Sequence, residues 1–267
     1  GNVPELGLDF NARAKEVFNN HVAQTKVALA ENREVDFIVW PENSVDVDPY
    51  TNKDVYEQLE SFDKPLIIGA ILGKGEKLFN TSILWGDKTQ DIYFKQHLTP
   101  FGEYIPLRSL AKKISPLVNQ VDDFSPGNGQ KTFTIAKAKI APVICFELID
   151  DEILAKAAKD SNILVVQTNS ATFGTSAESA QQLSITRIRA IEHSRNIASV
   201  STTGISAIID FDGKVVQQTS MGTAEHVFAS IGLIEQSSLR DRIGDGASVL
   251  TLIWLLAVAR RPYTSRR

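Results

Sequence analysis

Apolar residues in the first part of the chain recur at helical spacing, with Val17, Phe18 and Val22 marking one side of residues 12–31. The apolar runs that follow are short and rich in β-branched and aromatic residues, which is typical of buried strands. They lie at residues 37–40, 65–72, 81–85 and 91–94. Pro41 ends the first run, because a proline cannot donate a hydrogen bond to a neighbouring strand.

The second part of the chain alternates between strand and helix patterns and then becomes a run of strands. Strands are predicted at residues 132–135, 141–146 and 163–167, and helices at 150–159 and 177–196. Ile188 and Ile191 mark the expected inner side of the second helix. Further strands are predicted at residues 197–203, 205–211, 214–219 and 227–234, with a hairpin turn at Asp212-Gly213. This order favours a layered α/β sandwich with helices outside the sheets, in one domain.

A nearly uninterrupted apolar run of 13 residues, Ala247–Ala259, stands apart near the end of the chain. A helix needs about 20 apolar residues to cross a membrane, so the run alone predicts either a buried or interfacial helix or part of a membrane span. Arginines follow at positions 260, 261, 266 and 267. They fit the cytoplasmic end of a membrane helix, which would place the body of the domain outside the cytoplasm.

Composition narrows the classes of function. A formal charge of −4 argues against a nucleic-acid binder, because no basic stripe is available to neutralise phosphates. An apolar share of 43% over 267 residues is enough for a sizeable core. Cys145 is the one cysteine, so no intramolecular disulfide can form. The opening, Gly1–Pro4, resembles the exit from a strand, and we therefore expect a fragment of a longer protein that lacks its first strand.

Three residues at predicted strand ends form a set that is sufficient for acyl transfer. Cys145 ends one apolar run, and Glu42 and Lys95 each follow another. A carboxylate can take the proton of a thiol, and a fixed ammonium can stabilise the oxyanion that forms when the sulfur attacks a carbonyl. Glu147 comes two residues after Cys145 and is expected on the same side of an extended strand.

A Cys–His dyad is the main alternative within this chemistry, since spacing alone also permits Cys145 to pair with His97 or His193. The histidines show no HExxH or paired spacing, so a zinc site is not expected. The sequence also contains no GxGxxG or Walker-type loop for phosphates. We therefore expect neither a metal nor a cofactor.

The segments around these residues resemble the nitrilase, or carbon–nitrogen hydrolase, superfamily. They are, in chain order, Trp40-Pro41-Glu42, Tyr93-Phe94-Lys95-Gln96-His97-Leu98 and Val143-Ile144-Cys145-Phe146-Glu147. The resemblance implies a four-layer αββα sandwich of the nitrilase type over residues 1–245, followed at residues 246–267 by an apolar membrane helix with a basic tail. It also implies that Glu42 is the general base and that Lys95 stabilises the tetrahedral intermediate.

Within the superfamily, three further segments are similar to the apolipoprotein N-acyltransferase branch. They are residues 98–106 (LTPFGEYIP), 168–174 (TNSATFG) and 187–192 (RIRAIE). The resemblance implies a bacterial cell-membrane enzyme whose catalytic domain is extracytoplasmic and whose C-terminus is cytoplasmic. A phospholipid would donate an acyl chain to Cys145 as a thioester, and the N-terminal amine of a diacylglyceryl-Cys lipoprotein would accept it.

The same resemblance assigns supporting roles to further residues. Glu103 is expected to support the base and the lysine, and Glu147 to shape the site beside Cys145. Phe146 stands where this branch commonly has Tyr, and residues 169–173 match its Asn-Asp-x-Trp-Phe pattern only loosely. Four residues are expected to contact substrate: Trp40, Phe146, Asn169 and Phe173.

Two other functions remain open from the sequence. A soluble carbon–nitrogen hydrolase would use the same three residues on a small amide, and a catalytically silent nitrilase-like domain would serve in binding or assembly. The apolar run Ala247–Ala259 favours the membrane acyltransferase, because a soluble amidase has no use for it.

Overall fold

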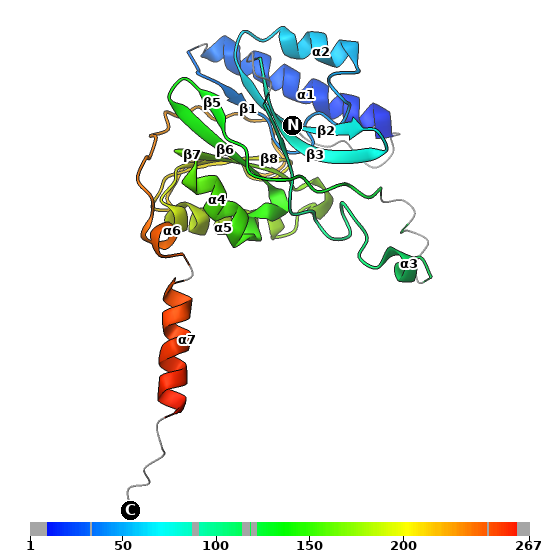
Figure 1. The fold of residues 1–267 in the computed structure, drawn as a ribbon. Coiled ribbons are helices and arrows are strands. Elements are labelled where there is room, and N and C mark those ends of the chain that lie inside the picture. Colours follow the sequence, from blue (N-terminus) through cyan, green and yellow to red (C-terminus); the bar gives the residue numbers. More distant parts are fainter. Residues whose placement is uncertain are drawn as a thin grey trace, which may run out of the picture.

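The computed structural model describes residues 10–32, 34–86, 91–113, 118, 122–244 and 246–260 of the 267. Two β-sheets lie face to face at its centre, and helices cover their outer faces (Figure 1). The strand order is β1-β2-β3-β4 in the first sheet and β10-β9-β8-β7-β6-β5 in the second. The expectation about an opening strand concerns residues outside the described part of the chain.

In the first sheet, β1 pairs with β2 in parallel and the other neighbours are antiparallel. Its strands are β1 (Ile38–Val39), β2 (Leu66–Lys74), β3 (Lys77–Trp85) and β4 (Ile92–Phe94). The outer helices are α1 (Phe10–Glu31) and α2 (Lys53–Glu60). The predicted helix and four strands of this half are confirmed, and α2 is an addition. Asn52 caps α2 by accepting a hydrogen bond from the amide of Val55.

In the second sheet, β6, β7 and β8 are parallel and the flanking strands are antiparallel. Its strands are β5 (Phe133–Ile135), β6 (Ala138–Ile144), β7 (Ile163–Asn169), β8 (Ile197–Thr202), β9 (Ala207–Ile209) and β10 (Val215–Gln218). The outer helices are α4 (Asp151–Lys159) and α5 (Glu178–His193). The predicted hairpin joins β9 to β10, with Gly213 at a φ of 79°. Short helices α3 (Arg108–Ala111) and α6 (Leu239–Ile243) lie outside the layers (Figure 1).

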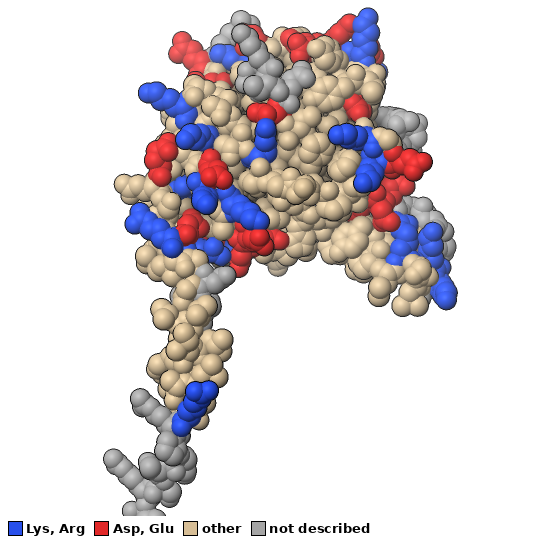
Figure 2. Space-filling model, viewed as in Figure 1, with Lys and Arg blue, Asp and Glu red and all other residues tan. Residues whose placement is uncertain are grey.

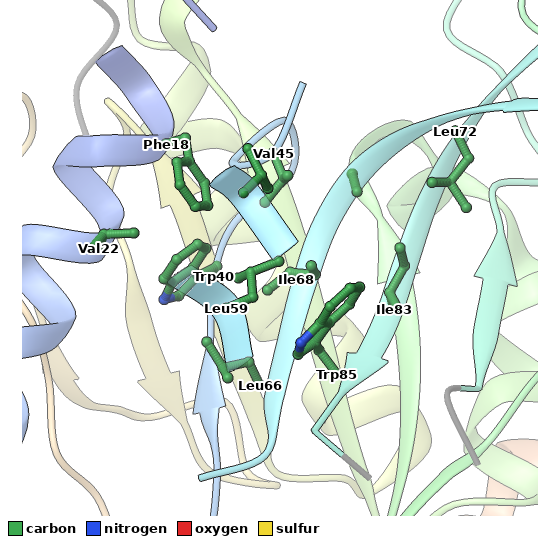
Figure 3. Packing of buried hydrophobic residues seen from close by; sticks show 12 residues of the cluster. Phe18, Val22, Trp40, Val45, Leu59, Leu66, Ile68, Leu72, Ile83 and Trp85 are labelled. Atoms are coloured by element: carbon green, nitrogen blue, oxygen red, sulfur yellow. The ribbon is translucent and has the colours of Figure 1, made fainter. Parts of the chain in front are cut away.

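Alternation along the strands separates the core into layers. Leu66 and Ile68 of β2 pack with Phe18 of α1, as Figure 3 shows. Ile67, between them in the sequence, faces the other way and packs in a second cluster with Val165 of β7. One face of the first sheet therefore belongs to the helices and the other to the second sheet.

The second sheet repeats this arrangement. Val165 faces the first sheet, whereas its neighbours Leu164 and Val166 pack in a third cluster with Leu154 of α4 and Ala190 of α5. The three clusters lie between four layers in the order helix, sheet, sheet, helix. This is the expected layered α/β sandwich.

The prediction of a strand through residues 141–146 is wrong at its end. Strand β6 stops at Ile144, and a 3₁₀ turn, Cys145–Ile149, follows it. The backbone φ of Cys145 is 48°. Glu147 closes this turn, because its Oε2 accepts a hydrogen bond from the Ile144 amide at 2.7 Å. Cys145 and Glu147 therefore do not share a face of an extended strand, and the argument from strand alternation fails.

The predicted strand at Val227–Ile234 is also wrong, because the segment forms no strand. A cavity of about 790 Å³ is lined by residues of β1, β8 and the segment 227–231, among others. No described strand pairs with this segment. Polar contacts hold the segment instead, including a hydrogen bond from the Ile234 amide to the Asn162 carbonyl and one from Asn196 Nδ2 to the Gly232 carbonyl.

The inner side of α5 differs from the apolar pattern. Ile188 and Ile191, expected to face the core, are exposed by 61% and 56%. The buried stripe of α5 is largely polar and consists of Ser179, Thr186, Arg189, Ala190 and His193. Hydrophobic periodicity fails here because polar side chains of α5 find buried hydrogen-bond partners.

The apolar run near the end of the chain forms α7 (Gly246–Ala259), which extends away from the layers (Figure 1). Every large apolar side chain described from Val249 to Val258 is exposed. Figure 2 shows an uncharged surface along this helix up to Arg260. Among the helices that the structure describes, none is long and apolar enough to cross a membrane. The division at residue 245, like the later arginines, falls on residues outside the described ones and stays a prediction.

Gly69 of β2 is required by the close passage of the chain that follows β1. A Cβ at this position would lie 2.3 Å from the Pro41 carbonyl oxygen and 2.7 Å from the Cα of Glu42. We expect Gly69→Ala to lower the free energy of unfolding by about 1–3 kcal/mol, as overpacking does, and to displace Glu42. Gly73→Ala is the matched control, because an added Cβ there meets nothing within 4 Å. Equal melting temperatures for the two variants would contradict this account.

Candidate active site

The three predicted residues lie at the ends of three strands, and the fold brings them together. Glu42 follows β1, where the Trp40 amide donates to the Ile67 carbonyl at 2.8 Å. Lys95 follows β4, and its own amide donates to the Asn80 carbonyl at 2.9 Å. Cys145 follows β6 in the second sheet. Carboxyl ends of strands are where sites form in open α/β sheets, because the side chains there are not covered by the next layer.

Lys95 is a buried charge of the site, with 1% of its surface exposed. Its Nζ lies 3.0 Å from Glu42 Oε1 and 2.8 Å from Glu103 Oε2. Burial lowers the pKa of Lys95, but the negative charges of Glu42 and Glu103 outweigh this effect and raise the pKa above its ordinary value. The lysine is therefore an ammonium ion at neutral pH, as stabilisation of an oxyanion requires.

Asn80 of β3 links the two carboxylates and was not predicted from the sequence. Its Nδ2 donates to Glu42 Oε1 at 2.8 Å and to Glu103 Oε1 at 2.6 Å. The Thr99 amide donates to Glu103 Oε2 at 2.7 Å. Nothing in the sequence singles out Asn80, because Thr81 and Ser82 beside it in β3 are also polar.

Cys145 is half-buried beside this charged group. Burial raises the pKa of the Cys145 thiol, the charge of Glu42 and its hydrogen bond to the thiol raise it further, and the Lys95 ammonium lowers it. The resting sulfur is thus a thiol, and Glu42 is near enough to influence its pKa. Gln182 of α5 also contacts the sulfur, with its Nε2 donating to Sγ at 3.7 Å. Nothing in the amino-acid sequence singles out Gln182, because Gln181 beside it is equally polar.

Glu147 is fully buried and does not contact the thiol; it holds the backbone around it. Its carboxylate accepts hydrogen bonds from the Ile144 amide at 2.7 Å, the Gln96 amide at 2.6 Å and the Tyr93 hydroxyl at 2.8 Å. Burial raises the pKa of Glu147, and these donors oppose the rise. The carboxylate therefore ties the turn at Cys145 to the segment that carries Lys95.

Trp40 does not lie in the site. Its ring packs against Phe18 of α1 at 5.9 Å between centroids, and its Nε1 donates to Thr25 Oγ1 at 2.9 Å. Figure 3 shows the indole in the outer core, between α1 and the first sheet.

The other three expected substrate contacts are half-buried or exposed. Phe146 follows the cysteine and packs edge-on against His97, with 5.1 Å between ring centroids. Asn169 is the last residue of β7, and its Nδ2 donates a hydrogen bond to Asn43 Oδ1 at 3.3 Å. Phe173 is 45% exposed, in the 3₁₀ turn Ala171–Phe173. No substrate contact follows from these positions alone.

The histidines of the alternative dyad have other partners. His97 Nδ1 lies 2.8 Å from Asp150, and His193 Nδ1 lies 2.8 Å from Asp241 beneath α5. Within the described residues, no three His, Cys, Asp or Glu side chains are grouped as a metal ion would need. Glu42 influences the pKa of the Cys145 thiol, whereas each of these histidines is paired with an aspartate, and this favours Glu42 over either histidine as the partner of the thiol.

A family model for carbon–nitrogen hydrolases matches residues 11–240. The chain belongs to the carbon–nitrogen hydrolase family. Its curated relatives include the apolipoprotein N-acyltransferase of Mycolicibacterium smegmatis, which is 37% identical over 242 residues, covering 82% of this chain and 40% of the relative. The apolipoprotein N-acyltransferase of Geobacter metallireducens is 32% identical over 225 residues, covering 79% of this chain and 42% of the relative. The chain thus spans about two fifths of the length of these relatives.

Solved carbon–nitrogen hydrolases share the fold. A superfamily protein of Xanthomonas campestris has a TM-score of 0.58 at 15% identity, covering 88% of this chain and 90% of its own. The amidase of Nesterenkonia AN1 gives 0.59 at 15% identity with the same coverage. A glutamine-dependent NAD⁺ synthetase of Acinetobacter baumannii gives 0.61 at 15% identity and covers 79% of this chain and 41% of its own. At these identities the likeness concerns the fold alone.

The influence of Glu42 on the thiol predicts how the rate of alkylation of Cys145 depends on pH. In Glu42→Gln the thiol loses its proton acceptor, so alkylation of Cys145 by iodoacetamide should be about 10-fold slower or more near pH 6. The charge of Glu42, which raises the thiol pKa, is also gone, so direct ionisation becomes easier as the pH rises. The difference in alkylation rate between Glu42→Gln and the wild type should therefore become smaller towards pH 9. Mass spectrometry at a series of pH values measures this, with Glu152→Gln on the exposed face of α4 as the control. Parallel pH profiles would argue against Glu42 as the base.

Proposed function

We propose that this chain is the catalytic part of a bacterial apolipoprotein N-acyltransferase. The observation that carries the proposal is the buried Glu42–Lys95 pair beside Cys145, in a chain whose curated relatives bear that name. The donor is a phospholipid, and the acceptor is the α-amine of a lipoprotein whose N-terminal cysteine carries a diacylglyceryl group.

In the first half-reaction Glu42 takes the thiol proton, and the sulfur of Cys145 attacks the carbonyl carbon of a phospholipid ester. The carbonyl oxygen becomes an oxyanion, which the Lys95 ammonium stabilises. The C–O bond then breaks, and the lysophospholipid leaves as an alcohol that takes the proton back from Glu42. The acyl chain remains on Cys145 as a thioester.

In the second half-reaction the neutral amine of the acceptor attacks the thioester carbonyl. A second oxyanion forms beside Lys95, and Glu42 accepts a proton from the attacking nitrogen. When the C–S bond breaks, the amide is released and the Cys145 thiolate recovers its proton from Glu42. The cycle consumes no cofactor.

The remaining predicted residues act through these three or on the substrate. Glu103 fixes Lys95 directly and, through Asn80, also fixes Glu42. Glu147 holds the turn that presents the sulfur. We keep Phe146, Asn169 and Phe173 as proposed substrate contacts because Phe146 follows Cys145 and the other two lie at or just after the end of β7, the strand beside β6. We omit Trp40 because its ring is in the outer core.

A membrane location follows from the same proposal. The exposed apolar side chains of α7 would be costly in water and are accounted for by a lipid or protein environment. We propose that α7 enters the cell membrane with the catalytic layers on the extracytoplasmic side and the arginines at its end in the cytoplasm. This places the site near its phospholipid donor.

Hydrolysis of a small amide is the second candidate, because a solved amidase shares the fold and the same three residue types serve either reaction. In that case water, not an amine, would attack the thioester. The exposed face of α7 has no purpose in a soluble amidase and favours the acyltransferase. A catalytically silent binding domain would not need a buried charge pair at the sulfur.

The test uses the full-length protein in detergent, with phospholipid and a synthetic peptide that begins with diacylglyceryl-Cys. We expect the peptide to gain one acyl chain as an amide, and the rate in Cys145→Ser to fall by about 10³-fold or more. The same peptide with an acetylated amine is the matched control and should gain nothing. Ammonia released from small amides without acylation of the peptide would show that the protein is an amidase. Full activity of Cys145→Ser would show that Cys145 is not the nucleophile.

A further inference from the structure

Gln182 contacts the reactive sulfur from an element that carries none of the three motif residues. It lies on α5, half-buried, and its Nε2 donates to Cys145 Sγ at 3.7 Å. Glu42 and Lys95 come from the first sheet, whereas α5 covers the second. The sulfur thus has a neutral donor in addition to the charged pair.

The hydroxyl group of Ser170 contacts the amide oxygen of Gln182. Ser170 Oγ donates to Gln182 Oε1 at 3.4 Å and lies 3.3 Å from Ser201 Oγ. The Ser170 amide donates to the Thr202 carbonyl at 3.0 Å, which fixes the serine to β8. Because the oxygen of the amide faces Ser170, its NH₂ group faces the sulfur.

Space around these hydroxyls is closed. A Cβ at Gly204 would lie 2.4 Å from Ser201 Oγ and 2.7 Å from the Oγ atoms of Ser170 and Ser179. The glycine backbone therefore packs directly onto the cluster, and the serines have little room to turn away from Gln182.

The charges nearby explain why a neutral donor matters. Lys95 already pairs with two carboxylates, at 3.0 Å and 2.8 Å, so much of its charge is offset before a thiolate forms. Glu42 beside the sulfur is negative until it takes the proton. A fixed N–H group favours negative charge on sulfur without adding a competing counter-ion.

We infer that Gln182 is a further catalytic residue, whose N–H stabilises the Cys145 thiolate, and that Ser170 is the positioning residue that orients its amide. The thiolate forms twice in the proposed cycle: when the thiol loses its proton, and when the C–S bond of the thioester breaks. The inference rests on the proposed role of Cys145 as the nucleophile. Gln182 aids both half-reactions, whereas Lys95 serves the oxyanion.

The test is alkylation of Cys145 by iodoacetamide in the full-length protein, followed by intact mass between pH 6 and 9. Cys145 is the one cysteine of this chain, so peptide mapping assigns the adduct. Gln182→Met keeps the size of the side chain and removes the donor. We expect alkylation about 3- to 10-fold slower, with the pH profile displaced upward by about 0.5–1 unit. Gln182→Glu should displace it further, and Ser170→Ala by less.

Gln181→Met is the matched control, because Gln181 is the exposed neighbour on the same helix and should leave the profile unchanged. A Gln182→Met profile equal to that of Gln181→Met overturns the inference. If melting curves show that Gln182→Met does not fold, Gln182→Glu and Ser170→Ala decide by the same displacement. The assay contains no phospholipid, so it is independent of acyl transfer: a displaced profile without acyl transfer would reject the proposed substrates and leave the role of Gln182 standing.

Discussion

A buried ammonium held between two carboxylates is the interaction on which the rest of this site depends. Lys95 is 1% exposed and lies within 3.0 Å of both Glu42 and Glu103. Removing charges from water costs several kcal/mol per ion, and the cost is offset only when each charge is paired and its remaining lone pairs are satisfied. Asn80 completes that condition by donating to both carboxylates. Glu42, Lys95, Glu103 and Asn80 therefore form one connected unit.

The charged unit follows strands of the first sheet, whereas Cys145 follows a strand of the second. Packing between the two sheets therefore determines how the sulfur lies relative to the charged unit. Ile67 and Val165 lie in the cluster between the two sheets, and Cys145 packs at its edge. Glu147 adds a polar connection, because it binds the amides of Ile144 and Gln96 on the two sides of the site. The position of Cys145 relative to Glu42 is thus set by a close-packed core and one buried carboxylate.

The positions of Glu42, Lys95 and Cys145 in the site were predictable, because strand ends can be recognised in the sequence. Pro41 and the apolar runs before Glu42, Lys95 and Cys145 place these residues at strand ends, and the fold brings them together. Asn80 and Gln182 were not predictable, since a polar residue inside an element gives no periodic signal and its value depends on partners far away in the chain. The turn at Cys145 was missed because Glu147 imposes it through a side-chain contact. The strand predicted at Val227–Ile234 does not form, because an apolar run becomes a strand only where another strand pairs with it.

The central claim is that this charged unit serves acylation of Cys145. Intact mass spectrometry of the full-length protein in detergent, incubated with phospholipid but no acceptor, tests it most directly. The account predicts a mass gain of one acyl chain that hydroxylamine removes and that is absent in Cys145→Ser. A protein that gains no mass, or an adduct of unchanged amount in Cys145→Ser, would contradict it.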